Sequence, residues 1–254
     1  PIEDHDGDFR AMPSRLGSSA GLKWVNVHAQ NRKRFGLPPV MAVYVLNDPA
    51  NAFPLAIMDG TLLTALRTGA AAAVASKYLA GRAPKTIAFI GCGEQARTLY
   101  GTHRAVFGDF EALAHDRSES HARTFAAEVG ARSVSLEEAA GADIVCTATP
   151  SRTPFLRADW VRMGAHVNAM GADAPGKQEL ETALLLGAQV FIDDMHQATG
   201  SGEINVPLSA GDFRVEDIAG TLGEVVAGSR SRPDPSRTTI FDSTGLAIQD
   251  VALA

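Results

Sequence analysis

The sequence predicts an α/β protein in which a doubly wound parallel sheet is joined to a smaller α+β domain. Residues 86–96 read TIAFIGCGEQA, so a short run of strand-forming residues leads directly into Gly91-x-Gly93-x-x-Ala96. From residue 86 onward, strand-like and helix-like segments alternate, which is typical of a parallel sheet. The first 80 residues differ, because they read as antiparallel strands followed by a long Ala-rich helix.

Each position of the glycine motif has a physical role. The first glycine permits a tight turn, the second lets the backbone approach a pyrophosphate, and the small Ala96 lets helix and strand pack closely. A pyrophosphate would accept hydrogen bonds at the helix N-terminus, where the helix dipole favours negative charge. The motif therefore predicts a Rossmann-type dinucleotide-binding unit.

Asp116 follows the next expected strand, 112–115, and lies 23 residues after Gly93. A carboxylate at this point can accept hydrogen bonds from ribose hydroxyls, which favours NAD. Arg117 leaves NADP as the alternative, because an arginine can pair with its additional phosphate. Asp116 also suits the N-terminal cap of a helix expected over 118–129, and the two roles are compatible.

The remaining elements follow from hydrophobic pattern and turn residues. Further strands of the parallel sheet are expected at 132–134, 143–149, 166–170 and 189–193, which gives six in total. Helices are expected from Ser135 and over 180–186, and a strand at 239–242 precedes a helix at 246–253. The N-terminal part contains expected strands at 23–27, 40–47 and 53–57 and a helix at 62–79. The expected domains are 1–80 with 244–254, and 81–243.

The composition and charge of the chain argue against several classes of function. The chain has 254 residues, 45% of them hydrophobic, and a net charge of −6, which argues against nucleic acid or an anionic membrane as partner. No apolar run approaches the roughly 20 residues of a membrane span. The two cysteines show no metal-ligand spacing, so we expect no metal, no disulfide framework and a cytoplasmic location. The chain begins at Pro1 without an initiator methionine, so we expect that an upstream segment is missing.

Candidate chemical residues lie outside the glycine motif. Asp173 follows the strand at 166–170, and ligands of open α/β sheets bind beyond the carboxyl ends of strands. It could transfer a proton to or from an amino or imino group, or it could only form a turn. Arg10, Lys23 and Arg67 stand among apolar residues, so each either reaches water or pairs with an anion such as a substrate carboxylate. The turn at 242–245 could contact a nicotinamide amide.

Several sequence blocks occur in order along nearly the whole chain. They are DGDFRAMP (6–13), GLKWVNVH (21–28), MAVYVLNDP (41–49), FPLAIMDG (53–60), LTALRTGAA (63–71), FIGCGEQA (89–96), ADIVCTATPSR (142–152), GAHVNAMGADAPGKQEL (164–180), GEINVPLSAG (202–211), LGEVVAG (222–228) and TIFDSTGLAIQDVA (239–252). In these blocks the chain resembles the ornithine cyclodeaminase and mu-crystallin family, and within it the archaeal-type alanine dehydrogenases.

The resemblance implies NAD-dependent oxidative deamination of a small L-amino acid, with L-alanine converted reversibly to pyruvate and ammonia. It implies that Lys23 and Arg67, with Arg10, bind the substrate carboxylate, and that Asp173 and Lys23 are the catalytic residues. It also implies a homodimer whose N-terminal domain binds substrate and forms the subunit interface. Family members usually begin several dozen residues earlier, with an active-site lysine in that segment, and have a longer C-terminal helix.

The cofactor-binding residues are also implied by the resemblance. They are Thr68, Gly91, Gly93, Glu94, Gln95, Ala96, Asp116, Arg117, Thr147, Ala148, Thr149, Met170, Gly171, Asp173, Ser243, Thr244 and Gly245.

The sequence leaves three alternatives for the function. They are ornithine cyclodeaminase, which uses NAD catalytically, ketimine reductase, and a non-catalytic protein that binds nucleotide and ligand. The cyclodeaminases carry a glutamate where Arg10 stands, and a cation there would repel the distal ammonium of ornithine.

Overall fold

The computed structural model describes residues 7–254 and forms two compact units. Unit 1 contains the described residues up to Arg67 together with Leu246–Ala254, and unit 2 contains Thr68–Gly245. The boundary between Arg67 and Thr68 falls inside one continuous helix, α2 (Gly60–Leu79). The sequence instead suggested division after residues 80 and 243. A helix end is visible in a sequence, whereas a change of packing partners along one helix is not.

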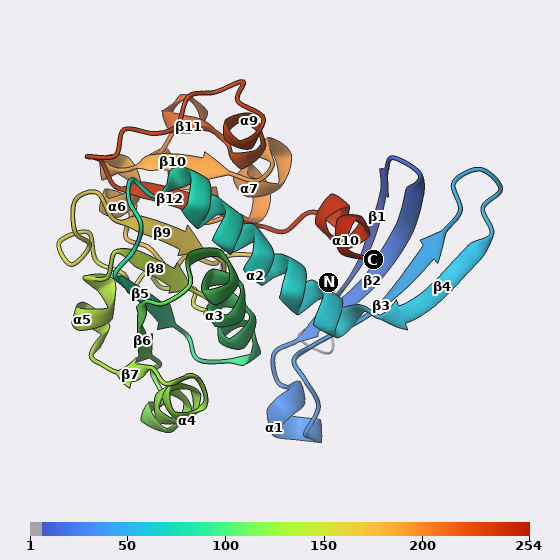
Figure 1. Cartoon of the computed structure of the whole chain (residues 1–254), viewed down its shortest axis with the longest axis horizontal. Helices are drawn as coiled ribbons and strands as arrows, with labels where there is room; N and C mark the ends of the chain where they lie inside the picture. The colour runs from blue at the N-terminus through green and yellow to red at the C-terminus, as the bar shows by residue number, and fades with distance from the viewer. Residues whose placement is uncertain (1–6) are drawn as a thin grey trace. The chain divides into compact units, whose positions relative to one another are not determined.

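Unit 2 is built on an eight-stranded sheet in which all neighbouring strands are parallel (Figure 1). The strand order is β11-β10-β12-β9-β8-β5-β6-β7. The strands are β5 (Thr86–Ile90), β6 (Glu111–His115), β7 (Arg132–Ser133), β8 (Ile144–Thr147), β9 (His166–Ala169), β10 (Gln189–Ile192), β11 (Ile218–Thr221) and β12 (Thr239–Asp242). Because β5 lies between β6 and β8, the chain changes direction across the sheet there, and this is where open α/β sheets bind ligands. The predicted doubly wound sheet is confirmed.

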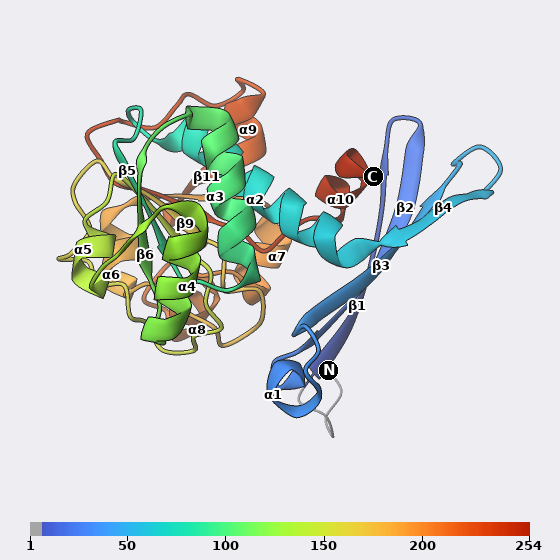
Figure 2. The same ribbon diagram turned by 60° about the horizontal axis from the view of Figure 1, so that its bottom comes forward.

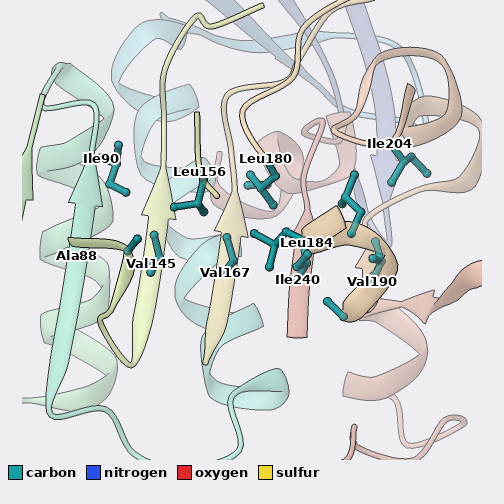
Figure 3. Packing of buried hydrophobic residues seen from close by; sticks show 14 of the residues in the cluster. Ala88, Ile90, Val145, Leu156, Val167, Leu180, Leu184, Val190, Ile204 and Ile240 are labelled. Atoms are coloured by element: carbon teal, nitrogen blue, oxygen red, sulfur yellow. The ribbon is translucent and has the colours of Figure 1, made fainter. Parts of the chain in front are cut away.

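Helices cover both faces of this sheet. Ile87 and Phe89 of β5 lie in one apolar cluster with α3 (Glu94–Phe107), α4 (Glu119–Val129), α9 (Leu222–Val226) and the second half of α2. Ala88 and Ile90 lie in a second cluster, shown in Figure 3, on the other face. The helices of this face are α5 (Leu136–Ala140), α6 (Thr182–Gly187), α7 (Met195–Ser201) and α8 (Asn205–Ala210). The alternation along β5 is what a strand buried on both sides requires.

Two strands were not anticipated from the sequence. The edge strand β11 has only four residues, includes Gly220 and lacks a hydrophobic pattern. The strand β1 (Gly7–Leu16) contains charged residues and Pro13, which disfavour strand structure in isolation. Both form because a neighbouring strand supplies hydrogen-bond partners.

Unit 1 is an antiparallel sheet in the order β1-β2-β3-β4, with β2 (Ser19–His28), β3 (Val40–Asn47) and β4 (Pro54–Asp59) (Figure 2). The short helix α1 (Asn31–Phe35) connects β2 to β3, and the C-terminal helix α10 (Ala247–Leu253) packs against β1 and β2. Tyr44, Leu63 and Val251 form a small core.

The two faces of the unit 1 sheet differ in character. The register pairs Lys23 with Tyr44, and both are fully buried on one face. The opposite face carries exposed apolar side chains, including Trp24, Val43 and Ile57, the last of them 74% exposed. Monomeric proteins rarely expose contiguous apolar patches of large side chains. This face therefore has the composition of an interaction surface.

We expect the stability of unit 2 to depend on Phe89, which is fully buried and makes edge-to-face contacts with Tyr100 and Phe125. Replacing Phe89 by alanine should lower the free energy of unfolding by about 3–5 kcal/mol, because a cavity replaces the ring. Denaturant unfolding followed by circular dichroism measures this change. Met163→Ala, at a position 85% exposed, is the control. A loss below about 1 kcal/mol for Phe89→Ala would contradict the assigned packing.

Candidate functional site

The turn between β5 and α3 has the geometry that a dinucleotide site needs. Gly91 has φ +93°, and an added Cβ would lie 2.7 Å from the carbonyl oxygen of Ala148, so only glycine is accommodated. Gly93 caps the N-terminus of α3, and apart from its chain neighbours no atom of the described residues lies within 4 Å of the place its Cβ would occupy. Ala96 is fully buried where α3 meets the sheet. An open backbone at a helix N-terminus fits a pyrophosphate.

Asp116 is fixed against this turn. Its Oδ2 accepts a hydrogen bond of 2.8 Å from the backbone N–H of Cys92, and its Oδ1 accepts one of 2.8 Å from the N–H of Ser118. The N-cap of α4 is Ser118 rather than Asp116. The carboxylate thus joins the glycine turn to the start of α4 at the carboxyl end of β6.

A cavity of about 450 Å³ opens beside Asp116. It is lined by His115, Asp116, Arg117, Glu119, Ala122, Ser133, Val134, Ser135 and Glu138. Three carboxylates therefore face it against the single guanidinium of Arg117. This balance is unfavourable for an additional phosphate group.

Glu179 joins the carboxyl ends of β8 and β9. It is fully buried, and its carboxylate accepts hydrogen bonds from the Thr147 hydroxyl at 2.6 Å, the Thr149 N–H and hydroxyl at 2.7 Å each, and the Gly171 N–H at 2.9 Å. An added Cβ on Gly171 would lie 2.6 Å from the Glu179 carboxyl group. Between these residues, Ala148 and Met170 donate their N–H groups to Ile90 and Thr147. Glu179 thus brings together three of the expected cofactor-binding residues, Thr147, Thr149 and Gly171.

Asp193, at the end of β10, accepts hydrogen bonds that hold the turn after β12 in place. Its carboxylate accepts hydrogen bonds from the N–H groups of Thr244 and Gly245 at 2.8 and 2.7 Å, and from the hydroxyls of Ser243 and Thr244 at 3.2 and 2.9 Å. Because β10 and β12 are neighbours, the turn after β12 is held over the end of β10.

The segment that carries Asp173 is also anchored. Glu203 is fully buried, and its Oε1 accepts hydrogen bonds from the N–H groups of Glu179 at 2.7 Å and Leu180 at 2.6 Å. Asp173 itself pairs with Lys177, and its side chain is 31% exposed. Asp173 is therefore a partly exposed carboxylate beyond the carboxyl end of β9, on a loop whose far end is held by Glu203.

In unit 1, Lys23 and Arg67 meet at one carboxylate. The Nζ of Lys23 lies 2.9 and 2.8 Å from the two carboxylate oxygens of Asp250, and the Nε of Arg67 lies 3.3 Å from Oδ1. Lys23 and Asp250 are fully buried. Burial, followed by the charge of Arg67, lowers the pKa of Lys23 to about 8, although Asp250 raises it. The pKa of Lys23 is therefore well below the ordinary value of 10.5 for a lysine.

Four other expected residues lie on β1, α2 and α3. Arg10 shares a sheet face with Lys23, but its guanidinium pairs with Asp8 at 2.6 Å. Thr68 begins the part of α2 that belongs to unit 2. In α3, Glu94 occupies the first turn, and the amide of Gln95 donates to the hydroxyl of Thr98.

Three acids that organise these groups are not among the residues predicted from the sequence, namely Glu179, Asp193 and Asp250. Glu179 and Asp193 could have been suspected, because each is a carboxylate placed after a strand or loop at the binding edge of the sheet. Asp250 gives no local signal, since it is 227 residues from Lys23 in the chain.

The described residues contain no metal-binding group, no exposed thiol and no helix that could span a membrane. Among residues 7–254 no group of three or more His, Cys, Asp or Glu could hold a metal ion. Both cysteines are buried and free, and burial raises the pKa of each thiol to about 12. In the described part of the chain no helix has the length and apolar character to cross a membrane.

Comparison with known proteins agrees with this geometry. The model of the ornithine cyclodeaminase/mu-crystallin family matches residues 1–254, and the chain belongs to this family. The alanine dehydrogenase of Archaeoglobus fulgidus is 49% identical over 259 residues, covering 100% of this chain and 80% of the relative. The iminosuccinate reductase of Paracoccus denitrificans is 37% identical, covering 98% and 78%.

Two solved structures match nearly the whole chain. An archaeal alanine dehydrogenase dimer with bound NAD matches with a TM-score of 0.93 and 49% identity, covering 98% of this chain and 79% of that chain. The Δ1-pyrroline-2-carboxylate reductase of Thermococcus litoralis, in complex with NADH and L-proline, matches with a TM-score of 0.93 and 35% identity, covering 99% and 81%.

The buried acids predict a pH effect on stability. Burial raises the pKa of Asp242 from 3.8 to about 7, so the folded state keeps a proton that the unfolded state releases near pH 4. Between about pH 4 and 7 the wild type should therefore lose unfolding free energy relative to Asp242→Asn. Denaturant unfolding at several pH values measures this difference. Asp109→Asn, at a side chain 95% exposed, is the matched control. A difference that stays constant with pH would contradict the assignment.

Proposed function

We propose that this protein catalyses the NAD-dependent oxidative deamination of a small L-amino acid, with L-alanine as the first candidate. The observation that carries the proposal is the Lys23–Arg67 pair, two cations held together in one chain with a dinucleotide-binding turn. A carboxylate is the natural ligand of such a pair. The 49% identity to an alanine dehydrogenase over the whole chain supports the choice of substrate.

NAD is the proposed cofactor. Asp116 stands where a carboxylate can accept hydrogen bonds from ribose hydroxyls, and the neighbouring cavity is lined by three carboxylates. Both features disfavour the additional phosphate of NADP. The solved relatives that contain NAD or NADH support the same choice.

The proposed mechanism divides the work between the residues. Lys23 and Arg67, with Arg10, bind and orient the substrate carboxylate. Bound NAD would supply the acceptor for the hydride that leaves the substrate Cα. Asp173 would take a proton from the amino group and release it to solvent. It would then take a proton from the water that attacks the resulting imine and return it to the departing amino group, which gives the 2-oxo acid and ammonia. A partly exposed carboxylate suits this role.

A small substrate agrees with Arg10. A cation at this position would repel the distal ammonium of ornithine, although Asp8 offsets part of its charge. This disfavours the cyclodeaminase alternative, and ketimine reduction remains the related reaction to test.

We also propose that the exposed apolar face of the unit 1 sheet forms a homodimer interface. Its large side chains include Phe9 stacked on Trp24, together with Val43 and Ile57. A matched structure is described as a dimer, which supports this assembly.

The central test is a spectrophotometric screen of L-amino acids with NAD and NADP. Net NADH formation with L-alanine is expected, and Asp173→Asn should lower kcat by about 10²–10⁴-fold while NADH binding is retained. Asp109→Asn is the surface control. Proline formation from ornithine without net NADH would favour cyclodeamination. Cofactor binding with no turnover of any amino or imino acid would favour a binding protein.

The interface is tested by sedimentation velocity. Ile57→Lys should shift the protein from dimer to monomer, because a buried charge without a partner is costly at an interface. Met163→Lys, at an exposed position of unit 2, should leave the dimer intact. A dimer that persists in Ile57→Lys and in Trp24→Glu would assign the interface to another surface.

A further inference from the structure

The described part of unit 1 contains an acid that the proposed mechanism does not use. We propose that Asp250 is a positioning residue of the substrate site, an internal counter-ion that keeps Lys23 and Arg67 together and charged so that they can bind a substrate carboxylate. The inference rests on the proposed function and extends it, because it makes the C-terminal helix α10 part of the substrate-binding machinery.

The geometry of the cluster supports this role. The Oδ1 and Oδ2 atoms of Asp250 lie 2.9 and 2.8 Å from the Nζ of Lys23. Oδ1 also lies 3.3 Å from the Nε of Arg67. The neighbouring Gln249 accepts a hydrogen bond of 3.2 Å from Arg67. Two consecutive residues of α10 thus hold the two cations, which come from β2 and α2.

Charge explains why a counter-ion is needed. Lys23 is fully buried, and it is faced by Arg67 from α2, Arg10 from β1, Tyr44 from β3 and Asp250 from α10. Burial and the two arginines favour the neutral amine, and Asp250 is the acid that opposes them. A buried charge that loses its partner is strongly destabilised, and a lysine responds by releasing its proton.

The charge of the cluster depends on the protonation of Lys23. Lys23 and Arg67 both pair with Asp250, and Arg10 pairs with Asp8. If Lys23 becomes neutral, the cluster loses one of the positive charges that attract an incoming anion. Because the pKa of Lys23 is about 8, affinity for a carboxylate should be constant below that pH and fall above it. Asp250 therefore sets the pH range in which the site can bind its substrate.

The test uses the purified protein saturated with NADH and titrated with oxamate, an unreactive isostere of pyruvate, by isothermal calorimetry from pH 6 to 9.5. A plot of the wild-type affinity for oxamate against pH should show a break near pH 8, above which the affinity falls. Asp250→Asn should weaken oxamate binding at least about tenfold at pH 7.5 and move the break below pH 7, because the opposing charge is lost. Asp250→Glu should restore most of the affinity. Asp109→Asn should match the wild type.

A structural role alone would give a different pattern. If Asp250 only stabilised α10, Asp250→Asn would lower Tm and the fraction of binding-competent protein but leave the break near pH 8. That result would overturn the inference, and so would a wild type that binds no oxamate. Should Asp250→Asn fail to fold, Lys23→Arg is the second variant: retained affinity without a break supports the inference, and an unchanged break overturns it. The amino-acid screen is independent, so absence of turnover together with the expected oxamate profiles would reject only the proposed reaction.

Discussion

The structure depends on buried carboxylates whose oxygens accept hydrogen bonds from the loops that form its sites. Removing a carboxylate from water is costly, and the cost is offset only where several donors converge on it. Glu179 receives four such bonds from the ends of β8 and β9. The same donors that make burial possible are thereby held in place. The buried carboxylate therefore determines the position of the loops that donate hydrogen bonds to it.

Two partly buried carboxylates hold other loops at the carboxyl ends of the strands in a similar way. Asp193 fixes the turn after β12, and Asp116 joins the glycine turn to α4. In unit 1, Asp250 follows the same logic with side-chain cations as donors. These acids therefore govern the position of the loops and the charge of the side chains with which they pair. Burial raises the pKa of Asp242, which indicates how much electrostatic cost the fold tolerates there.

Local sequence was sufficient for the dinucleotide unit. The strand, the glycine turn and α3 are contiguous, so their identities follow from propensity, turn geometry and spacing along one short segment. It was insufficient for β1 and β11, whose strand structure comes from pairing with neighbours. It was also insufficient for the role of Asp250, because its partners Lys23 and Arg67 are distant in the chain.

The sequence by itself therefore determined the fold class, the family resemblance and the identity of candidate residues such as Asp173 and Lys23. The tertiary structure alone decided what those residues pair with: Lys23 with Asp250, Arg10 with Asp8, and Thr147 and Thr149 with Glu179. Propensity and motif spacing act between near neighbours in the chain. Burial and charge pairing act between neighbours in space, and these set the protonation and orientation on which the chemistry depends.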